Sequence, residues 1–488
     1  MTSKGDHRMW TGKQAGLIGI VIFLLAGFCF GQPAVSLSPK DGPPTTTLRV
    51  SGSGFTPYAQ IDIYFDNQDQ ALAVADAAGA FNQIAIQAPK SAVPGTHWVT
   101  AAERSGRIVK QEIFEVHVNW TEFHTKDMHR ENPYENVLSV DNVGSLRLKE
   151  SYRTNGAVPW SSFAVANRVA FVGSTDHNVY AFDTHTGTKL WSYATGGQIP
   201  WSSPAVVNGV VYIGSEDQNL YALNASTGAV LWSYPTGNQV HASPLVSKGV
   251  VYFGSMDDNV YALDASTGSL LWSYSTGGYV SSSPAVVNGV LYVGSYDGNV
   301  YALDASTGAK IWTYPTGNSV FSSPAVVNGV VYIGCHDHNL YALNANTGAL
   351  IWRYPTNDIV YSSPAVANGV VYFGSYDGNV FALTAGRGKK LWSYLTGNGV
   401  MSSPAVANGV VYIGSWDGNV YALNASTGAK LWNYQTGNGV GSSPTVVNGM
   451  VYVGSNNSYL YAFGLPKGRV QQPPKRPDLK TLRPDFDF

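Results

Sequence analysis

The segment Ala302-Leu303-Asp304-Ala305-Ser306-Thr307-Gly308-Ala309-Lys310-Ile311-Trp312 decides the fold, because versions of it recur along most of the chain. The tryptophan that ends it returns at a spacing of 41 residues once and then 40 residues five times. A period of about forty residues is typical of β-propeller blades, in which each repeat is one small sheet. The tryptophans at this docking position are Trp191, Trp232, Trp272, Trp312, Trp352, Trp392 and Trp432.

One repeat, Ser282 to Tyr314, shows the strands that each blade should contain. Alternating or wholly apolar runs predict strands at 283–287, 290–295, 299–304 and 310–314. Asn288-Gly289 between the first two runs is a strong signal for a tight hairpin. Each repeat therefore predicts four antiparallel strands. The 53 glycines, 30 tyrosines and only 12% charged residues also favour an all-β protein.

The two ends of the repeat region give the number of blades. Seven repeats carry all four strands, but the last, Ser442 to Gly464, stops after its third strand. Upstream of the first repeat, Leu148 to Tyr152 matches a fourth strand, with Glu150 in the place of tryptophan. We therefore expect an eight-bladed β-propeller over residues 144–464, in which the N-terminal strand completes the last blade and closes the ring.

The N-terminal region predicts export. Lys4, Arg8 and Lys13 precede an apolar run from Ala15 to Phe30, which is the pattern of a signal peptide or N-terminal anchor over residues 1–31. The protein is then expected in the periplasm or at the cell surface. Membrane association would come only through this segment or through a partner. The two cysteines, Cys29 and Cys335, form no intrachain disulfide if the signal is removed.

Three further segments surround the propeller. Short alternating strands broken by Gly and Pro turns predict a small β-sandwich over residues 33–118. A polar stretch over 119–143, with His124, Asp127, His129 and Glu131, is interpreted as a solvated linker rather than a metal site. Residues 465–488, rich in proline and lacking periodicity, predict a flexible tail.

The repeated segment resembles the tryptophan docking motif of quinoprotein alcohol dehydrogenases and other PQQ-like repeat propellers. The resemblance implies that each tryptophan ring packs against the Thr-Gly peptide of a neighbouring blade. In the sandwich, Gly52-Ser53-Gly54-Phe55-Thr56-Pro57 resembles bacterial immunoglobulin-like domains of the IPT type. Both resemblances concern the fold, which does not by itself define a function.

Two functional classes share the PQQ-like propeller. A dehydrogenase of this kind is expected to hold PQQ and Ca²⁺ on the ring axis, often beside two adjacent cysteines. This sequence has no adjacent cysteine pair, and its regular period leaves no long insertions for substrate and metal groups. The chain is more similar to the non-enzymatic propeller factor of the outer-membrane β-barrel assembly machinery. We expect no catalytic residue, no cofactor and no metal, with a PQQ-dependent oxidoreductase as the alternative.

Comparison of the repeats with one another indicates a candidate binding rim. Two connections on one face of the disc vary in almost every blade, whereas the Asn-Gly and Ser-Thr-Gly turns on the other face are nearly constant. The large side chains at the first varied position are Trp160, Trp201, His241, Phe321, Tyr361 and Met401. Those at the second are Glu216, Met256, Tyr296, His336, Tyr376 and Trp416.

Aromatic, Met and His side chains on a rigid surface suit the binding of a protein or peptide. The simpler interpretation is drift between duplicated repeats, and a carbohydrate-binding surface is a third. We expect an envelope protein or peptide as the partner of a monomeric chain. The formal charge of −2 gives no indication of nucleic-acid binding.

Two groups of potential metal ligands have structural interpretations. An aspartate recurs in the turn before the third strand in seven blades, where it is expected to hydrogen-bond its own backbone. Its positions are Asp176, Asp217, Asp257, Asp297, Asp337, Asp377 and Asp417. His336 and His338 lie close to Cys335, but a metal there would require a third ligand from another blade.

Overall fold

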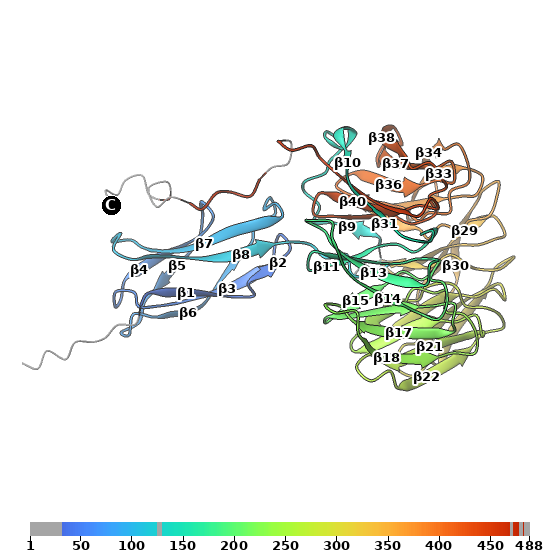
Figure 1. Ribbon diagram of the computed structural model, residues 1–488, viewed down its shortest axis with the longest axis horizontal. Coiled ribbons are helices and arrows are strands. Elements are labelled where there is room, and N and C mark those ends of the chain that lie inside the picture. Colours follow the sequence, from blue (N-terminus) through green and yellow to red (C-terminus); the bar gives the residue numbers. More distant parts are fainter. Residues whose placement is uncertain (1–31, 124–128, 469–471, 478–481, 483–488) are drawn as a thin grey trace, which may run out of the picture.

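The computed structural model describes residues 32–123, 129–468, 472–477 and 482. These residues form a β-sandwich beside a larger disc of radial sheets (Figure 1). The predicted signal peptide or anchor, residues 1–31, lies outside the described residues. Within the described ranges, no helix is both long and apolar enough to cross a membrane.

The sandwich consists of two sheets that enclose one apolar core. A three-stranded sheet contains β1 (Ala34–Ser38), β3 (Thr47–Ser53) and β6 (Phe81–Gln87). A five-stranded sheet contains β2 (Asp41–Gly42), β8 (Val109–Val116), β7 (Gly95–Glu103), β4 (Gln60–Phe65) and β5 (Gln68–Val74). Leu48, Ile61, Phe65, Val99 and Phe114 are fully buried between them. The predicted sandwich is confirmed.

Eight four-stranded antiparallel units, called blades, form the disc. The blades are numbered along the chain, and the strands of each blade are given from the innermost to the outermost. Blade 1 has β11 (Ala164–Ala166), β12 (Val169–Gly173), β13 (Asn178–Asp183) and β14 (Lys189–Ala194). Blade 2 has β15 (Ala205–Val207), β16 (Val210–Gly214), β17 (Asn219–Asn224) and β18 (Val230–Pro235). Blade 3 has β19 (Leu245–Ser247), β20 (Val250–Gly254), β21 (Asn259–Asp264) and β22 (Leu270–Ser275). Blade 4 has β23 (Ala285–Val287), β24 (Val290–Gly294), β25 (Asn299–Asp304) and β26 (Lys310–Pro315).

The remaining four blades follow the same order. Blade 5 has β27 (Ala325–Val327), β28 (Val330–Gly334), β29 (Asn339–Asn344) and β30 (Leu350–Pro355). Blade 6 has β31 (Ala365–Ala367), β32 (Val370–Gly374), β33 (Asn379–Thr384) and β34 (Lys390–Leu395). Blade 7 has β35 (Ala405–Ala407), β36 (Val410–Gly414), β37 (Asn419–Asn424) and β38 (Lys430–Gln435). Blade 8 has β39 (Thr445–Val447), β40 (Met450–Gly454), β41 (Tyr459–Gly464) and, from the start of the disc, β10 (Arg147–Arg153).

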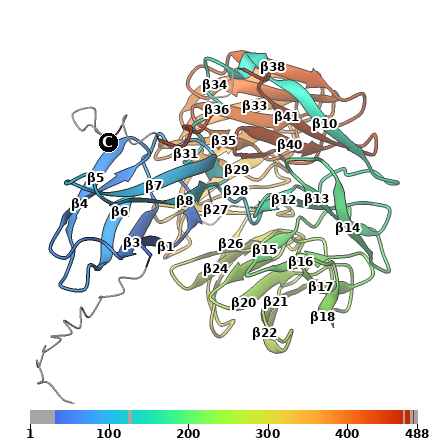
Figure 2. The same cartoon turned by 60° about the vertical axis from the view of Figure 1, so that its left-hand side comes forward.

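Blade 8 joins the two ends of the propeller. β10 pairs antiparallel with β41, with Leu148 opposite Phe463 and Tyr152 opposite Leu460. Figure 2 shows β10 beside the C-terminal strands β40 and β41. The expected eight-bladed ring, closed by its N-terminal strand, is therefore confirmed. A short 3-10 helix, η1 (Val143–Ser145), leads into β10.

The docking tryptophans connect consecutive blades, as the motif implies. Trp272 Nε1 of blade 3 donates to the Ala305 carbonyl oxygen of blade 4 at 3.0 Å, and Tyr252 OH donates to the same oxygen. The Trp272 ring lies against Gly308, where an added Cβ would lie 2.7 Å from the ring. Trp191, Trp232, Trp312, Trp352 and Trp392 make the same contact with the next blade.

The two junctions of blade 8 use other groups, because this blade lacks the motif. Trp432 Nε1 of blade 7 donates to the Leu146 carbonyl just before β10. Glu150 takes the tryptophan position opposite Ala462. The ring that packs against Gly187 of blade 1 is instead that of Tyr152, two residues farther along the strand. The chain thus keeps an aromatic ring at the closing junction.

A ring of serines surrounds the axis and passes through all eight blades. Each serine donates its backbone N–H to the hydroxyl oxygen of the equivalent serine in the next blade, over 2.9 to 3.2 Å. The last bond runs from Ser443 of blade 8 to Ser162 of blade 1. The ring comprises Ser162, Ser203, Ser243, Ser283, Ser323, Ser363, Ser403 and Ser443.

The repeated aspartates also connect the blades, in addition to their turn role. The Asp297 carboxylate accepts the N–H of Asn299 in its own turn, the hydroxyl of Tyr301, and the N–H of Gly277 from the preceding blade. Partial burial raises the pKa of Asp297, but these hydrogen bonds outweigh it and hold the pKa below its ordinary value. The same balance lowers the pKa of Asp176, Asp337 and Asp417. The structural interpretation of these carboxylates is confirmed.

The predicted solvated linker is wrong for the described residues of 119–143. Trp120 is buried and exchanges two backbone hydrogen bonds with Val165 on the inner edge of blade 1. The Thr121 carbonyl accepts from Val206 of blade 2, and the His129 carbonyl from Val366 of blade 6. β9 (Glu131–Asn132) pairs parallel with β35. Inner strands have unpaired edges toward the axis, so this segment supplies their missing partners.

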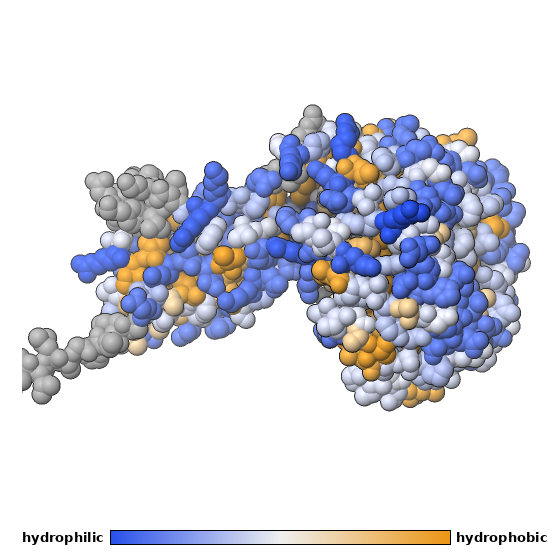
Figure 3. Space-filling model, in the orientation of Figure 1, coloured by the Kyte–Doolittle hydropathy of each residue, from blue (hydrophilic) through white to orange (hydrophobic). Residues whose placement is uncertain are grey.

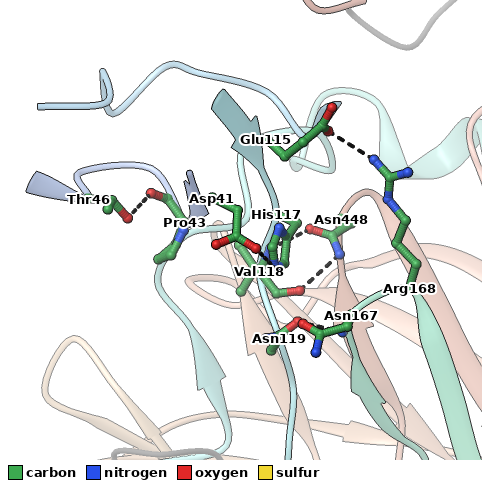
Figure 4. Close-up of polar contacts among 10 residues, drawn as sticks. All are labelled: Asp41, Pro43, Thr46, Glu115, His117, Val118, Asn119, Asn167, Arg168 and Asn448. Atoms are coloured by element: carbon green, nitrogen blue, oxygen red, sulfur yellow. Dashed lines mark hydrogen bonds and ion pairs between the residues drawn. The ribbon is translucent and has the colours of Figure 1, made fainter. Parts of the chain in front are cut away.

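The sandwich joins the face of the disc that carries the constant Asn-Gly turns (Figure 4). The Asn448 side chain of blade 8 makes two hydrogen bonds with the backbone of Val118, at 2.8 and 2.9 Å. Arg168 of blade 1 forms an ion pair with Glu115 at 2.9 Å. The varied connections lie on the other face and are therefore not covered by the sandwich.

The outer surface of the disc is predominantly polar. Isolated leucines on the outermost strands, such as Leu231, Leu271 and Leu391, are about half exposed. Figure 3 shows a largely hydrophilic surface with small, separate apolar patches over the sandwich and the disc. Scattered apolar residues of this kind are normal on a protein surface and do not identify a binding site.

The docking contact predicts unequal effects for two glycines of positive φ. Gly308 and Gly289 have φ of 73° and 82°, but an added Cβ meets the Trp272 ring only at Gly308 and nothing within 4 Å at Gly289. Gly289→Ala should cost about 1 to 2 kcal/mol of unfolding free energy through backbone strain. Gly308→Ala should cost about 3 kcal/mol or more, because the ring must also move. Urea unfolding measures both, and equal losses would contradict the docking role.

The aspartates predict acid sensitivity. Because the folded-state pKa values of Asp176, Asp297, Asp337 and Asp417 are lowered, their stabilisation is present above the unfolded pKa of about 4 and is lost as the pH falls through the folded values. We expect the urea midpoint to fall between about pH 5 and pH 2. Replacing Asp176, Asp297, Asp337 and Asp417 by Asn should flatten this decline. Asn457 already fills the turn position in blade 8, where its side chain bonds Tyr459 and Tyr461. If the urea midpoint of the fourfold variant falls with pH as steeply as that of the unmodified protein, this assignment is refuted.

Candidate functional site

The first varied position places its side chains around the axis of the disc. An axial cavity of about 60 Å³ is lined by that position in all eight blades, together with Phe123 and members of the serine ring. These connections lead directly into the innermost strands, and for this reason their side chains point to the centre. Trp160, Trp201, His241, Phe321, Tyr361 and Met401 of the predicted rim all line this cavity.

The aromatic rings pack on one another across the axis. Trp160 and Trp201 of neighbouring blades are stacked, with ring centroids 3.7 Å apart and an angle of 1° between planes. Trp201 also meets Phe321 of blade 5 at 5.1 Å, in an edge-to-face arrangement. Phe321 in turn meets Tyr361 at 5.3 Å. The two edge-to-face contacts have a favoured geometry for aromatic pairs, whereas the Trp160 and Trp201 rings lie nearly face to face.

The second varied position surrounds the first. Trp416 lies 6.3 Å from Trp160, and His336 lies 4.4 Å from Tyr361, measured between ring centroids. Tyr296 contacts Phe321 and Tyr376 contacts Tyr361. Glu216 approaches His241, whereas Met256 occupies the equivalent turn of blade 3. We call the two sets together the axial aromatic cluster.

The axial aromatic cluster is more compact than a rim. Most of its members are half-buried against one another, and Tyr376 is the most exposed large apolar member, at 41%. The sequence indicated which positions vary and that both lie on one face. It did not indicate that the rings would meet across the axis, because that contact joins blades distant in sequence.

The floor of the axial cavity comes from the segment expected to be a linker. Phe123 lines the cavity, and the fully buried Arg130 lies beneath it, with its guanidinium donating to the Phe123, Ser403, Pro404 and Pro444 carbonyls. Burial lowers the pKa of Arg130 to about 9, which leaves it charged at neutral pH. The Phe123 ring lies 4.5 Å from this cation. No sequence pattern pointed to these residues.

Two histidines in the cluster are neutral at physiological pH. Burial lowers the pKa of His241 to about 4 and also lowers the pKa of His336. His241 Nε2 lies 3.3 Å from Glu216 Oε1, and burial raises the pKa of that carboxyl. In the described part of the chain, the buried atoms Trp160 Nε1, Trp416 Nε1 and His336 Nε2 have no hydrogen-bond partner. Such atoms are costly unless a ligand or water satisfies them.

The axial cavity does not fit PQQ, which is a planar tricarboxylate. Its volume of about 60 Å³ is well below the roughly 300 Å³ of the smaller ligand pockets. The described residues that line it include no Lys or Arg to pair with carboxylates, and no Asp or Glu to bind Ca²⁺. The stacked Trp160 and Trp201 rings occupy the space on one side of the axis.

The other metal candidates either lie outside the described residues or belong to structural elements. His124 and Asp127 lie outside the described residues, and Glu131 belongs to β9. Burial raises the pKa of the Cys335 thiol to about 11, and the thiol donates to the Asn318 carbonyl. Among the described residues, no three His, Cys, Asp or Glu side chains form a group that could hold a metal.

Solved structures with this fold include both functional classes. BamB from Moraxella catarrhalis matches with a TM-score of 0.58 and 24% identity, over 67% of this chain and 99% of its own. A europium-containing methanol dehydrogenase matches at 0.62 and 16%, over 71% and 98%. The quinohemoprotein alcohol dehydrogenase from Comamonas testosteroni matches at 0.63 and 18%, over 72% and 82%. These identities support a common fold alone. No curated protein sequence gives a significant match.

A family match covers the whole propeller. The profile of the family described as outer membrane protein assembly factor BamB matches residues 144–234, 175–319, 321–403 and 397–472, more than half of the 488 residues. The matched residues are those that build the eight blades and carry the docking tryptophans. This chain therefore belongs to the family of outer membrane protein assembly factor BamB.

Proposed function

We propose that this protein is an exported, non-enzymatic scaffold of the cell envelope, which binds a protein or peptide partner through the axial aromatic cluster. The observation that carries the proposal is the concentration of large, half-buried rings on the one face of the disc that the sandwich leaves open. Rigid aromatic side chains give large contact area at low entropic cost, which is typical of interface hot spots.

The unpartnered polar atoms support the same proposal. Trp160 Nε1 and Trp416 Nε1 can only donate hydrogen bonds, so they require acceptors. A peptide segment carries such acceptors in its backbone carbonyls, which would reach these buried atoms only when the rings move apart, and its side chains can contact the rings. The family's description as an outer membrane protein assembly factor agrees with an envelope protein as the partner. The poor fit of the cavity to PQQ makes the oxidoreductase the weaker alternative.

A site-specific photo-crosslinking experiment tests the proposed surface. A photoreactive amino acid at Tyr376, in the axial aromatic cluster, should give defined adducts with an envelope protein in the cells that make this chain. The same residue at Leu391, 49% exposed on the outermost strand of blade 6, is the control and should not. With the purified partner, Tyr376→Ala should weaken binding about tenfold, as expected for a hot-spot ring, and Leu391→Ala should not.

The alternatives predict different results. Saturable binding of PQQ with Ca²⁺, followed by absorbance, together with dye-linked alcohol oxidation, would overturn the non-enzymatic proposal. Binding to a glycan array that is lost in Trp201→Ala and Trp416→Ala would favour a carbohydrate ligand. Equal adducts from Tyr376 and Leu391 would exclude the cluster as the specific surface.

A further inference from the structure

Part of the C-terminal tail, residues 472–477, lies on the sandwich, where the sequence predicted a flexible end. After β41, the described residues Gln472–Pro477, with the sequence Gln-Pro-Pro-Lys-Arg-Pro, run against β7 and β8 (Figure 1). This segment is therefore in contact with the sandwich, whereas its flexibility stays a prediction. Its proline-rich sequence favours an extended conformation that needs no hydrogen bonds of its own.

Three contacts fix the tail on the sandwich. The Pro473 ring lies directly on the backbone of Gly95, where an added Cβ would come within 2.8 Å of Pro473 Cγ. The Arg476 guanidinium lies over the Trp98 ring at 5.1 Å from its centroid. Gln111 joins the tail at both ends of its amide: its Oε1 accepts from Arg476 Nε at 2.6 Å, and its Nε2 donates to the Pro477 carbonyl at 3.3 Å.

The sheet face beneath the tail is covered in the folded chain. Val99 and Ala101 of β7 point into the sandwich core, so Trp98 and Thr100 point to the opposite face. Thr100 is nevertheless fully buried on that face, as is most of Tyr64 on β4. Gln111 Nε2 also donates to Thr100 Oγ1 at 3.1 Å, which connects the tail contact to this buried residue. Pro477 itself is buried.

We propose that the outer face of β7 and β8 is a binding surface for an extended, proline-rich segment with one arginine, and that the chain's own tail occupies it in cis. Gly95 leaves room for a proline ring, and Trp98 binds the arginine by cation–π stacking. Gln111 forms hydrogen bonds with the arginine and with a backbone carbonyl. The occupied surface ties the sandwich to the end of the propeller, in addition to residues 119–143 and to the contacts of Arg168 with Glu115 and of Asn448 with Val118. This inference is independent of the axial aromatic cluster.

Peptide binding in trans tests this surface. The receptor is the chain ending at Lys467, which retains every strand of the disc, and the probe is a fluorescent peptide of residues 465–488. Fluorescence anisotropy should show saturable binding to the shortened chain and at least tenfold weaker binding to the full chain, because the tethered tail competes at high effective concentration. Trp98→Ala in the shortened chain should remove the binding.

Two peptide variants distinguish the specific contacts of Arg476 from the effect of positive charge alone. Arg476→Ala in the peptide removes the side chain that contacts Trp98 and Gln111 and should weaken binding at least tenfold, whereas Lys475→Ala, which removes the same charge from the neighbouring residue, should change it less than twofold. If the shortened chain folds poorly, the full chain with Arg476→Ala replaces it as the receptor and should bind the wild-type peptide more tightly than the unmodified full chain. Absence of saturable binding, equal binding to both receptors, or equal losses from the two peptide variants would overturn the proposal.

Discussion

The closure of the ring is the constraint on which the rest of the structure depends. Radial sheets cannot stand alone, because each buries its faces only against two neighbours. Tryptophan docking supplies the contact at seven junctions, with the indole donating to a carbonyl of the next blade or of the residues before β10. At the eighth junction Tyr152 lies on Gly187, and the serine ring closes around the axis through Ser443 and Ser162.

Ring closure also explains the behaviour of residues 119–143. Closure of the circle leaves the inner edges of the short innermost strands facing the axis. The segment between sandwich and disc lies along several of these edges and offers backbone partners to Val165, Val206 and Val366. It also buries Arg130 below the axial cavity. Phe123 of this segment lines the axial cavity together with the axial aromatic cluster.

The candidate site and the fold are made of different residues in the same repeat. Docking tryptophan, turn aspartate and axial serine hold each blade to the next and recur with little change. The two positions of the axial aromatic cluster change from blade to blade, from Trp201 to Ser281 and from Trp416 to Asn456. Variation at these positions is compatible with folding because their neighbours in the repeat already satisfy the junctions. Binding chemistry can therefore be altered without loss of the ring.

The sequence by itself determined the blades, their number and their closure by β10, because these follow from local periodicity and from a repeat that is incomplete at one end. It also determined most strands of the sandwich and which side chains vary on one face. Only the tertiary structure decided that Trp201 meets Phe321, that Arg130 lies beneath Phe123 near the axis, and that Arg476 stacks on Trp98. The physical reason is that these contacts join segments far apart in the chain. Neither partner has a local pattern that reveals the other, so only the folded chain brings them together.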